Sequence, residues 1–258
     1  MSGSLSNKLN VALIQMESGR DIRVNFKLAE AYLIDAVVQH KAEFIVYPEN
    51  FLCLGVDDYS LLYADFQDYI EAFKALAKEH KISILLGSIP IPVDKHTKKC
   101  YSRSLLINEN GQIACFYDKI HLFDVLVNDA QGQYKESDSF KAGQNVKVAP
   151  LLNHQLGLSI CYDLRFPELY MKLRAKGAQI LAVPSAFTYN TGQAHWEILL
   201  RSRAIETQCF ILAANQCGEH LSGKNNKIRK TWGHSMIVDP WGKVLSSLES
   251  SPGVCSAE

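Results

Sequence analysis

The chain has 258 residues, 47% of them hydrophobic, and its 27 basic residues balance its 27 acidic residues. This length and composition are typical of a globular protein with a large core. Balanced charge without a basic run argues against nucleic acid or an anionic membrane surface as a partner, and favours a small neutral or weakly acidic substrate.

The first half of the chain alternates strand-like and helix-like segments. Apolar periodicity predicts strands at 10–16, 43–50 and 82–90, and helices at 25–41 and 68–81. Two further strands, 102–107 and 112–119, flank the turn NENG and predict a hairpin. The predicted order over residues 8–122 is therefore β-α-β-α-β followed by a hairpin.

The long polar segment 124–145 connects this half to the next one. Polar loops are most often passive linkers. A connection of this length inside a compact protein is, however, more often functional than passive.

The second half, residues 146–250, repeats the order of the first. Strands are predicted at 156–163, 178–187 and 209–217, helices at 167–177 and 194–208, and a hairpin at 233–248 that turns at DPWG. In both halves a proline, Pro48 or Pro184, follows the second buried strand.

The repeated order predicts the fold. Helix-strand alternation implies parallel pairing, the hairpins add antiparallel strands, and two helices per half cover only one face of each mixed sheet. The bare faces must then pack together. We expect an α/β protein, a four-layer αββα sandwich with an internal pseudo-two-fold repeat, in which residues 1–258 form one domain.

Seven scattered cysteines form no C-x-x-C pair and no zinc-type spacing: Cys53, Cys100, Cys115, Cys161, Cys209, Cys217 and Cys255. This pattern indicates reduced thiols. The N-terminus is polar, and no apolar run is long enough to cross a bilayer. We therefore expect a cytoplasmic protein, with no metal and no other cofactor.

Three ionisable residues lie at the carboxyl ends of predicted strands: Glu49 after FIVYP, Lys119 after IACFYD and Cys161 at the end of LGLSI. Reactive groups of α/β proteins gather beyond the carboxyl ends of strands. Because two of these residues belong to the first half and one to the second, they can meet only where the two sheets face each other. This convergence is the candidate active site.

Cys161 lies at a strand-to-helix turn, with Pro167 early in the helix that follows. Peptide N–H groups at such a turn can stabilise a thiolate and bind an oxyanion. A cysteine with an ordinary pKa of about 8.5 needs a base or a cation to react at neutral pH. Glu49 could be that base, and Lys119 could be the cation and a donor to the oxyanion.

Each of these residues also has a structural interpretation. Taken alone, Cys161 is more often a core residue than a nucleophile, and a single glutamate or lysine is more often solvated. Cys217, also at a strand end, is the competing nucleophile. A Cys-His arrangement would use His121, His195 or His234 as the base, although each of these has a more common structural role.

The motifs around these residues resemble the nitrilase superfamily over nearly the whole chain: YPENF, YDKIHLFD, CYDLRFPE, PSAF, AHWE, LLRSRAIETQ and GHSMIVDPWG. The superfamily has an αββα fold and a Glu-Lys-Cys triad. The match is closest to its Nit branch of amidases, where SAF, RAIETQC and QCG look more like deaminated glutathione amidases than like ω-amidases.

The resemblance implies roles for the three candidate residues and two others. Glu49 would be the general base, Lys119 the oxyanion stabiliser and Cys161 the nucleophile. Glu136, in YKESDSF, would position the lysine and the substrate. The backbone N–H of Tyr162 would contribute to the oxyanion hole.

Two further positions match residues that contact a substrate carboxylate in this branch, Arg165 and Thr191. A planar guanidinium suits that task. The alternative for Arg165 is an ion pair with Asp163 or Glu168 that fixes the turn.

The resemblance predicts a hydrolase of linear amides that forms a cysteine thioester. Its expected substrate is deaminated glutathione, cut to 2-oxoglutarate and cysteinylglycine. The alternatives are an ω-amidase acting on 2-oxoglutaramate or 2-oxosuccinamate, and a catalytically silent scaffold. Members commonly form eight-layer dimers supported by tail segments, so a homodimer is expected, with its details open because the sequence stops at SPGVCSAE.

Overall fold

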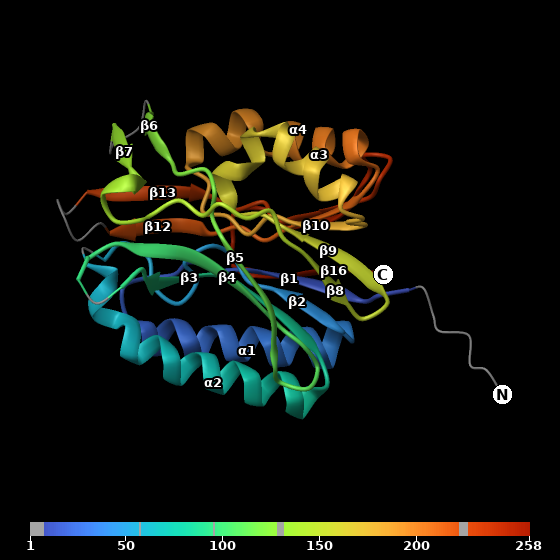
Figure 1. Cartoon of the computed structure of the whole chain (residues 1–258). Coiled ribbons are helices and arrows are strands. Elements are labelled where there is room, and N and C mark those ends of the chain that lie inside the picture. The colour runs from blue at the N-terminus through green and yellow to red at the C-terminus, as the bar shows by residue number, and fades with distance from the viewer. Residues whose placement is uncertain (1–7, 57, 95, 128–131, 222–226) are drawn as a thin grey trace.

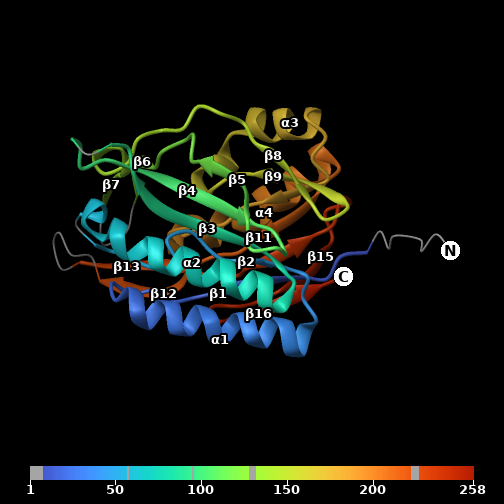
Figure 2. The same cartoon turned by 60° about the horizontal axis from the view of Figure 1, so that its bottom comes forward.

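A computed structural model of the chain describes residues 8–56, 58–94, 96–127, 132–221 and 227–258. Within these residues two six-stranded mixed sheets face each other, and two helices cover the outer face of each sheet (Figure 1). Figure 2 shows the same layers from a second direction. The predicted four-layer αββα sandwich is therefore confirmed.

The first sheet has the strand order β16-β1-β2-β3-β4-β5. Strands β1, β2 and β3 are parallel, and the other pairings are antiparallel. The bounds are β1 Val11–Gln15, β2 Phe44–Val46, β3 Ser83–Pro92, β4 Cys100–Ile107, β5 Ile113–Asp118 and β16 Gly253–Ala257, with helices α1 Ile22–His40 and α2 Tyr63–His80 and the 3₁₀ helix η1 Tyr59–Leu62.

The second sheet has the order β15-β14-β11-β10-β9-β8. Here β9, β10 and β11 are parallel. The bounds are β8 Val148–Leu151, β9 His154–Leu158, β10 Ile180–Ala182, β11 Phe210–Ala213, β14 Met236–Val238 and β15 Val244–Ser247, with helices α3 Pro167–Ala175 and α4 Tyr189–Thr207.

The two sheets repeat one another. Strands β1, β2, β3, β4 and β5 correspond in order and direction to β9, β10, β11, β14 and β15. Each sheet also gains one antiparallel strand beside its first strand, β16 beside β1 and β8 beside β9. The sequence analysis missed both added strands, and β16 lies beyond residue 250, in the sheet of the first half.

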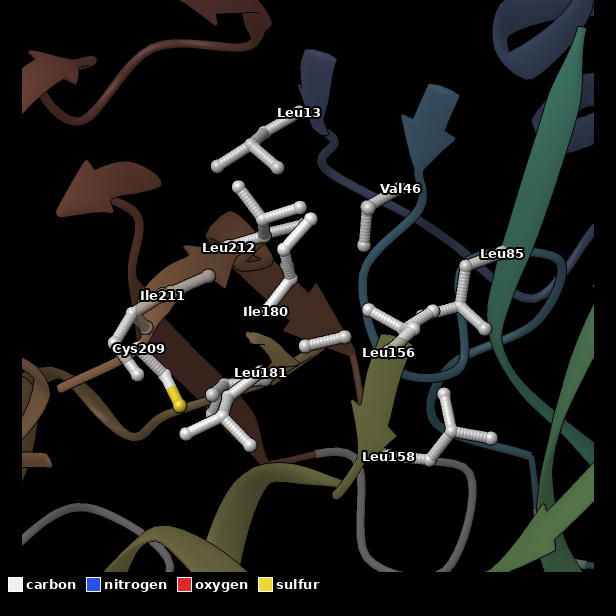
Figure 3. Close-up of a cluster of buried hydrophobic side chains, with 14 of the residues drawn as sticks. Leu13, Val46, Leu85, Leu156, Leu158, Ile180, Leu181, Cys209, Ile211 and Leu212 are labelled. Atoms are coloured by element: carbon white, nitrogen blue, oxygen red, sulfur yellow. The ribbon is translucent and has the colours of Figure 1, made fainter. Parts of the chain in front are cut away.

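Alternating side chains of the central strands build two separate packing layers. Leu13, Val46 and Leu85 point from the first sheet into a cluster shared with the second sheet (Figure 3). Their neighbours in sequence, such as Ile14 and Ile45, belong to the cluster under α1 and α2. Burying one such side chain stabilises the fold by about 1.5–3 kcal/mol, which explains why these strands are apolar on both faces.

Helix α4 begins earlier than predicted, at Tyr189 instead of residue 194. Thr191 and Gly192 precede the predicted start, yet both residues lie in the first turn of the helix. A Cβ on Gly192 would lie 2.3 Å from the Trp232 Cβ, so close packing against the neighbouring strand requires glycine here. Tertiary packing thus overrides the low helix propensity of glycine.

Two small hairpins lie at the end of the molecule opposite the C-terminus (Figures 1 and 2). One pairs β6 (Asp124–Leu126) with β7 (Gln133–Lys135), followed by the 3₁₀ turn η2 (Glu136–Asp138); the other pairs β12 (Cys217–Leu221) with β13 (Ile228–Trp232). The first hairpin belongs to the long middle segment, of which residues 128–131 lie outside the described part of the chain.

None of the helices in the described ranges combines the length and the apolar character that crossing a membrane requires.

Candidate active site

Glu49 is held beyond the end of β2 by residues from both halves of the chain. The segment that leaves β2 lies close against β3 at Gly87, where an added Cβ would lie only 2.0 Å from the Tyr47 carbonyl oxygen. The buried Glu49 Oε2 accepts a hydrogen bond from the Ala186 N–H at 2.9 Å. The Gln216 side-chain amide donates to the Glu49 carbonyl oxygen at 3.1 Å. The carboxylate is therefore fixed in place.

Lys119 follows β5 directly, and its side chain is only 2% exposed. Its ammonium group donates to Glu49 Oε1 at 2.8 Å and to both carboxylate oxygens of Glu136, at 3.0 and 2.9 Å. Glu136 begins η2, and its Oε2 also accepts a hydrogen bond from the Phe123 N–H at 2.6 Å. The long middle segment thus delivers a second carboxylate to the lysine.

Cys161 is the first residue of the 3₁₀ turn η3 (Cys161–Arg165), between β9 and α3. Its φ of 48° lies in the left-handed region, a conformation that costs a non-glycine residue about 1–3 kcal/mol and that clusters at functional sites. Its N–H donates to the Pro184 carbonyl oxygen at 2.9 Å. Pro167 occupies the first turn of α3, as predicted.

Asp163 fixes this turn from within the core. Its Oδ2 accepts hydrogen bonds from the Tyr117 hydroxyl at 2.7 Å and from the Ile160 N–H at 2.9 Å. Its Oδ1 accepts from the His121 N–H at 3.0 Å and lies 2.7 Å from His121 Nδ1. Because Tyr117 belongs to the first sheet and Ile160 follows a strand of the second, Asp163 joins the two halves beside Cys161.

The electrostatics of the site favour a neutral thiol beside an ionised carboxylate. Burial raises the pKa of the Cys161 thiol, and the charge of Glu49 raises it further. Burial also opposes ionisation of Glu49, but the charge and hydrogen bond of Lys119 outweigh it and bring the pKa of Glu49 below its usual value. A thiol with a raised pKa carries little thiolate at neutral pH, so a nucleophilic role for Cys161 would require a base to remove its proton.

The other two groups are shifted by the same cluster. Burial lowers the pKa of Lys119, but the charges of Glu136 and Glu49 overcome this effect and hold it well above its usual value. Burial and the charge of Glu49 raise the pKa of Glu136, and Lys119 only partly offsets them. Lys119 thus remains a cation, and Glu136 binds a proton more readily than Glu49 does.

A cavity of about 170 Å³ opens beside Glu49, Lys119 and Cys161. Glu136 and Tyr162 line it, together with Thr191 from the first turn of α4. The Thr191 hydroxyl lies 2.6 Å from that of Thr188, another residue of the wall. Six of the seven predicted site residues therefore share one cavity.

Arg165 is the exception, because it is not among the described residues that line the cavity. Its Nη2 lies 3.2 Å from His195 Nδ1, and its guanidinium carbon lies 5.5 Å from the centre of the Phe187 ring. The alternative ion pair with Asp163 or Glu168 is not formed either, since Asp163 is paired with His121 instead. A role for Arg165 in substrate binding stays a prediction.

The competing residues have other contacts. His121 stacks on Phe166 and His234 stacks on Trp232, in both cases with an interplanar angle of 7°. Cys217 is buried in β12, where burial raises the pKa of its thiol to about 12. These surroundings favour structural roles for the histidines and for Cys217.

Sequence reasoning missed three groups of this site. Asp163 was considered only as a partner of Arg165, and Gln216, which donates to Glu49 and to the Ser18 hydroxyl, was read as part of a strand. Arg229, on β13, lines the cavity. Its strand is short and rich in charge, so nothing in the local pattern marked it. Only Asp163 carried a usable signal, since it lies two residues after the candidate nucleophile.

Within the described ranges, no group of three or more His, Cys, Asp or Glu side chains is arranged to hold a metal ion. The described part of the site brings together a thiol, two carboxylates and a lysine. A buried cysteine beside a carboxylate and a cation, between two facing sheets, is typical of α/β enzymes that use a cysteine nucleophile.

The chain belongs to the carbon-nitrogen hydrolase family, whose model matches residues 10–258, and thus to the nitrilase superfamily. It is a hydrolase of carbon-nitrogen bonds other than peptide bonds, an amidase with an active-site cysteine that binds amide substrates. The alternative of a catalytically silent scaffold is therefore set aside.

Curated relatives and solved structures agree with this assignment. The chain is 40% identical over 248 residues to the deaminated glutathione amidase of Yersinia enterocolitica, covering 92% of this chain and 81% of that protein. The NitFhit protein of C. elegans has a TM-score of 0.87 and 38% identity; the match covers 96% of this chain and 60% of that one. An amidase of Nesterenkonia sp. AN1, in a variant with acrylamide added at its active-site cysteine, has a TM-score of 0.81 and 25% identity, with 97% and 93% coverage.

Proposed function

We propose that this protein is a deaminated glutathione amidase in which Cys161 is the nucleophile, Glu49 the general base and Lys119 the oxyanion stabiliser. The observation that carries the proposal is the convergence of these three buried side chains at one cavity. The substrate is supported by the relatives that bear this name at 38–42% identity.

In the first step Glu49 takes the proton of the Cys161 thiol while the sulfur attacks the amide carbon. The negative charge that develops on the carbonyl oxygen is stabilised by Lys119 and by the backbone N–H of Tyr162. Because the site is buried, these interactions act in a medium of low dielectric and are stronger than in water.

In the second step the tetrahedral intermediate breaks its C–N bond. Glu49 returns the proton to the leaving nitrogen, so cysteinylglycine departs and a thioester remains on Cys161. Water, deprotonated by Glu49, then attacks the thioester carbon and releases 2-oxoglutarate and the free thiol. Every atom of the products comes from the substrate and one water molecule.

The remaining predicted residues position these groups. Glu136 orients the Lys119 ammonium through two hydrogen bonds. Thr191 and Arg165 are proposed to contact a substrate carboxylate. Thr191 lines the cavity, which supports this role, whereas Arg165 is not among the described lining residues.

We also propose one domain, a homodimer and a cytoplasmic location. One hydrophobic cluster contains side chains of both sheets, which supports a single domain. Met171 on α3 and Ile198 and Ile205 on α4 are large apolar side chains with 50–68% exposure, which supports burial of this helical face against a second copy. The seven cysteines are all free thiols, in keeping with a reducing compartment.

The deciding experiment compares kcat/KM on deaminated glutathione and on 2-oxoglutaramate for the wild type and for Cys161→Ala. We expect the wild type to prefer deaminated glutathione and the variant to lose activity on both substrates. A preference for 2-oxoglutaramate would instead identify an ω-amidase. Activity that survives in Cys161→Ala would reject the assigned nucleophile.

A further inference from the structure

Arg229 is a cation of the cavity wall, and one of its N–H donors has no acceptor among the described residues. One terminal nitrogen, Nη2, donates to the Ala186 carbonyl oxygen, and the guanidinium carbon lies 5.4 Å from the centre of the Tyr134 ring. Nε is buried and has no hydrogen-bond partner within the described residues. Nor does Arg229 form an ion pair with any carboxylate of the described ranges. A buried donor without an acceptor is costly, so this guanidinium is suited to receive an anion.

The two lysines among the described lining residues of the cavity are already paired. Lys119 is enclosed by Glu49 and Glu136. Lys135 has a side chain that is 59% exposed and lies 3.3 Å from Asp138. Among the described lining residues, Arg229 is therefore the cation best placed to recognise a carboxylate.

We propose that Arg229 binds the carboxylate at the acyl end of the substrate, the 2-oxo acid end of deaminated glutathione. This inference rests on the proposed function, because it requires a substrate whose acyl group carries a carboxylate. A guanidinium presents two N–H groups in one plane and matches the two carboxylate oxygens.

Two observations favour the acyl end over the peptide leaving group. Arg229 is anchored on Ala186, whose own N–H holds the Glu49 carboxylate, so its charge lies near the reacting atoms. The cavity of about 170 Å³ is smaller than the roughly 300–1,000 Å³ of a typical ligand pocket. It suits a short acyl group, while the cysteinylglycine part extends toward the opening.

The test uses 2-oxopentanoate, which keeps the 2-oxo acid but has a methyl group where the substrate has its amide. Its ability to protect Cys161 from alkylation by iodoacetamide measures binding without catalysis. Since hydrogen bonds to charged groups contribute about 1.5–3 kcal/mol, Arg229→Met should raise the protecting concentration about 10- to 150-fold. Arg229→Lys keeps the charge and loses the planar guanidinium, so it should raise the protecting concentration by an intermediate factor. It replaces Arg229→Met in the test if that variant does not fold.

The matched control is Lys230→Met, on the next residue of β13. Lys230 is 53% exposed and lies 3.7 Å from Glu219, so we expect wild-type protection. The control ligand 2-pentanone lacks the carboxylate. Its protecting concentration should therefore differ between wild type and Arg229→Met far less than that of 2-oxopentanoate does. Equal protection by 2-oxopentanoate in wild type and both Arg229 variants would overturn the inference.

Steady-state kinetics of the wild type and Arg229→Met tests this inference separately from the proposed function. A parallel loss of kcat/KM on 2-oxoglutaramate, mainly through KM, would support Arg229 as the carboxylate-binding residue. A wild type that hydrolyses 2-oxo acid amides with unchanged KM in Arg229→Met would reject the inference alone. A wild type that hydrolyses none of them would reject the proposed function, and the inference with it.

Discussion

In the proposed mechanism the reactivity of Cys161 depends on a proton transfer to Glu49, because burial raises the pKa of the thiol while Lys119 keeps the carboxylate ionised. Alkylation of the wild type by iodoacetamide should therefore vary little between about pH 6 and pH 9, the base being ionised throughout. In Glu49→Gln the rate must instead follow thiolate formation and rise about tenfold per pH unit.

Labelling rates measured by mass spectrometry check this prediction, with Glu136→Gln as the control that keeps the base. A wild-type rate that climbs with pH as in Glu49→Gln would contradict it. The same reasoning gives kcat/KM an acid limb below pH 4.5, the usual pKa of the carboxyl, since activity is lost as pH falls through the lowered pKa of Glu49. General base catalysis contributes about 10²- to 10⁴-fold, which is the expected loss of kcat/KM in Glu49→Gln.

Asp163 shows how one buried side chain supports another. In Asp163→Asn an amide NH₂ replaces an oxygen that accepts hydrogen bonds, so donors on Tyr117, Ile160 or His121 lose their acceptor. We expect the free energy of unfolding to fall by about 1–3 kcal/mol and kcat/KM to fall with it, because the turn that carries Cys161 loosens.

Urea unfolding and steady-state kinetics measure both effects. The control is Asp138→Asn, since Asp138 is half exposed and forms an ion pair with the exposed Lys135; a surface change of this kind costs at most about 0.5 kcal/mol. Equal stability of the two variants would show that the hydrogen bonds of Asp163 do not hold the turn.

At the scale of elements, the close approach of the segment after β2 to Gly87 of β3 positions Glu49. Gly87→Ala would press a methyl group against the Tyr47 and Pro48 carbonyl oxygens, at 2.0 and 2.3 Å. Overpacking of this kind typically costs about 1–3 kcal/mol. Because the displaced backbone leads directly to Glu49, we also expect kcat to fall.

Thermal unfolding and steady-state kinetics measure both effects. The control is Gly253→Ala, a glycine replaced in another strand of the same sheet. Its added Cβ would meet Leu248 at 3.7 Å, an ordinary contact, so the variant should be neutral or more stable by about 0.4–1 kcal/mol. If Gly87→Ala behaved in the same way, the close approach at Gly87 would not be what positions the carboxylate.

The elements that could be predicted from the sequence are those whose burial repeats with the period of a strand or a helix. Strand β1 is buried at every position, and its apolar run marks it clearly. Strand β13 has one buried position, the polar Thr231, and no run of buried apolar side chains, so no pattern distinguishes it from a loop. Strand β16 is defined by pairing with β1 at the other end of the chain, which local reasoning cannot see.

The same limit applies to the candidate site. Glu49, Lys119 and Cys161 follow strands and could be found from position alone. Arg229 reaches the cavity because β13 packs beside α4 at Gly192 and Trp232. This tertiary contact leaves no pattern in the sequence around Arg229. Positions set by strand ends are thus predictable, and positions set by hairpins packed across the sheets are not.

At the scale of the whole molecule, the two halves share one hydrophobic cluster, and the chain adds β16 to the first sheet after completing the second. Leu85 of the first sheet lies in the same cluster as Leu156 of the second, and β16 enters the first sheet after the chain has completed the second. Neither sheet can therefore expose its inner face without exposing the other. We expect the halves to unfold in one transition.

Two probes report on the halves separately. All three tryptophans, Trp196, Trp232 and Trp241, lie in the second half, so their fluorescence follows its unfolding. The buried thiol of Cys53, labelled in pulses and read by mass spectrometry, follows the first half. In urea the two midpoints should coincide, as the all-or-none behaviour of a single domain requires.

Leu85→Ala tests whether destabilising the first half also destabilises the second. Truncation of a buried leucine costs about 2–5 kcal/mol, and although Leu85 lies in the first half, the tryptophan midpoint should fall as far as the Cys53 midpoint does. The control Leu28→Ala removes a side chain that is 43% exposed and should shift both midpoints little. A tryptophan transition that stays at its wild-type midpoint while Cys53 becomes accessible would mean that the halves are two domains, and that the shared cluster does not couple them.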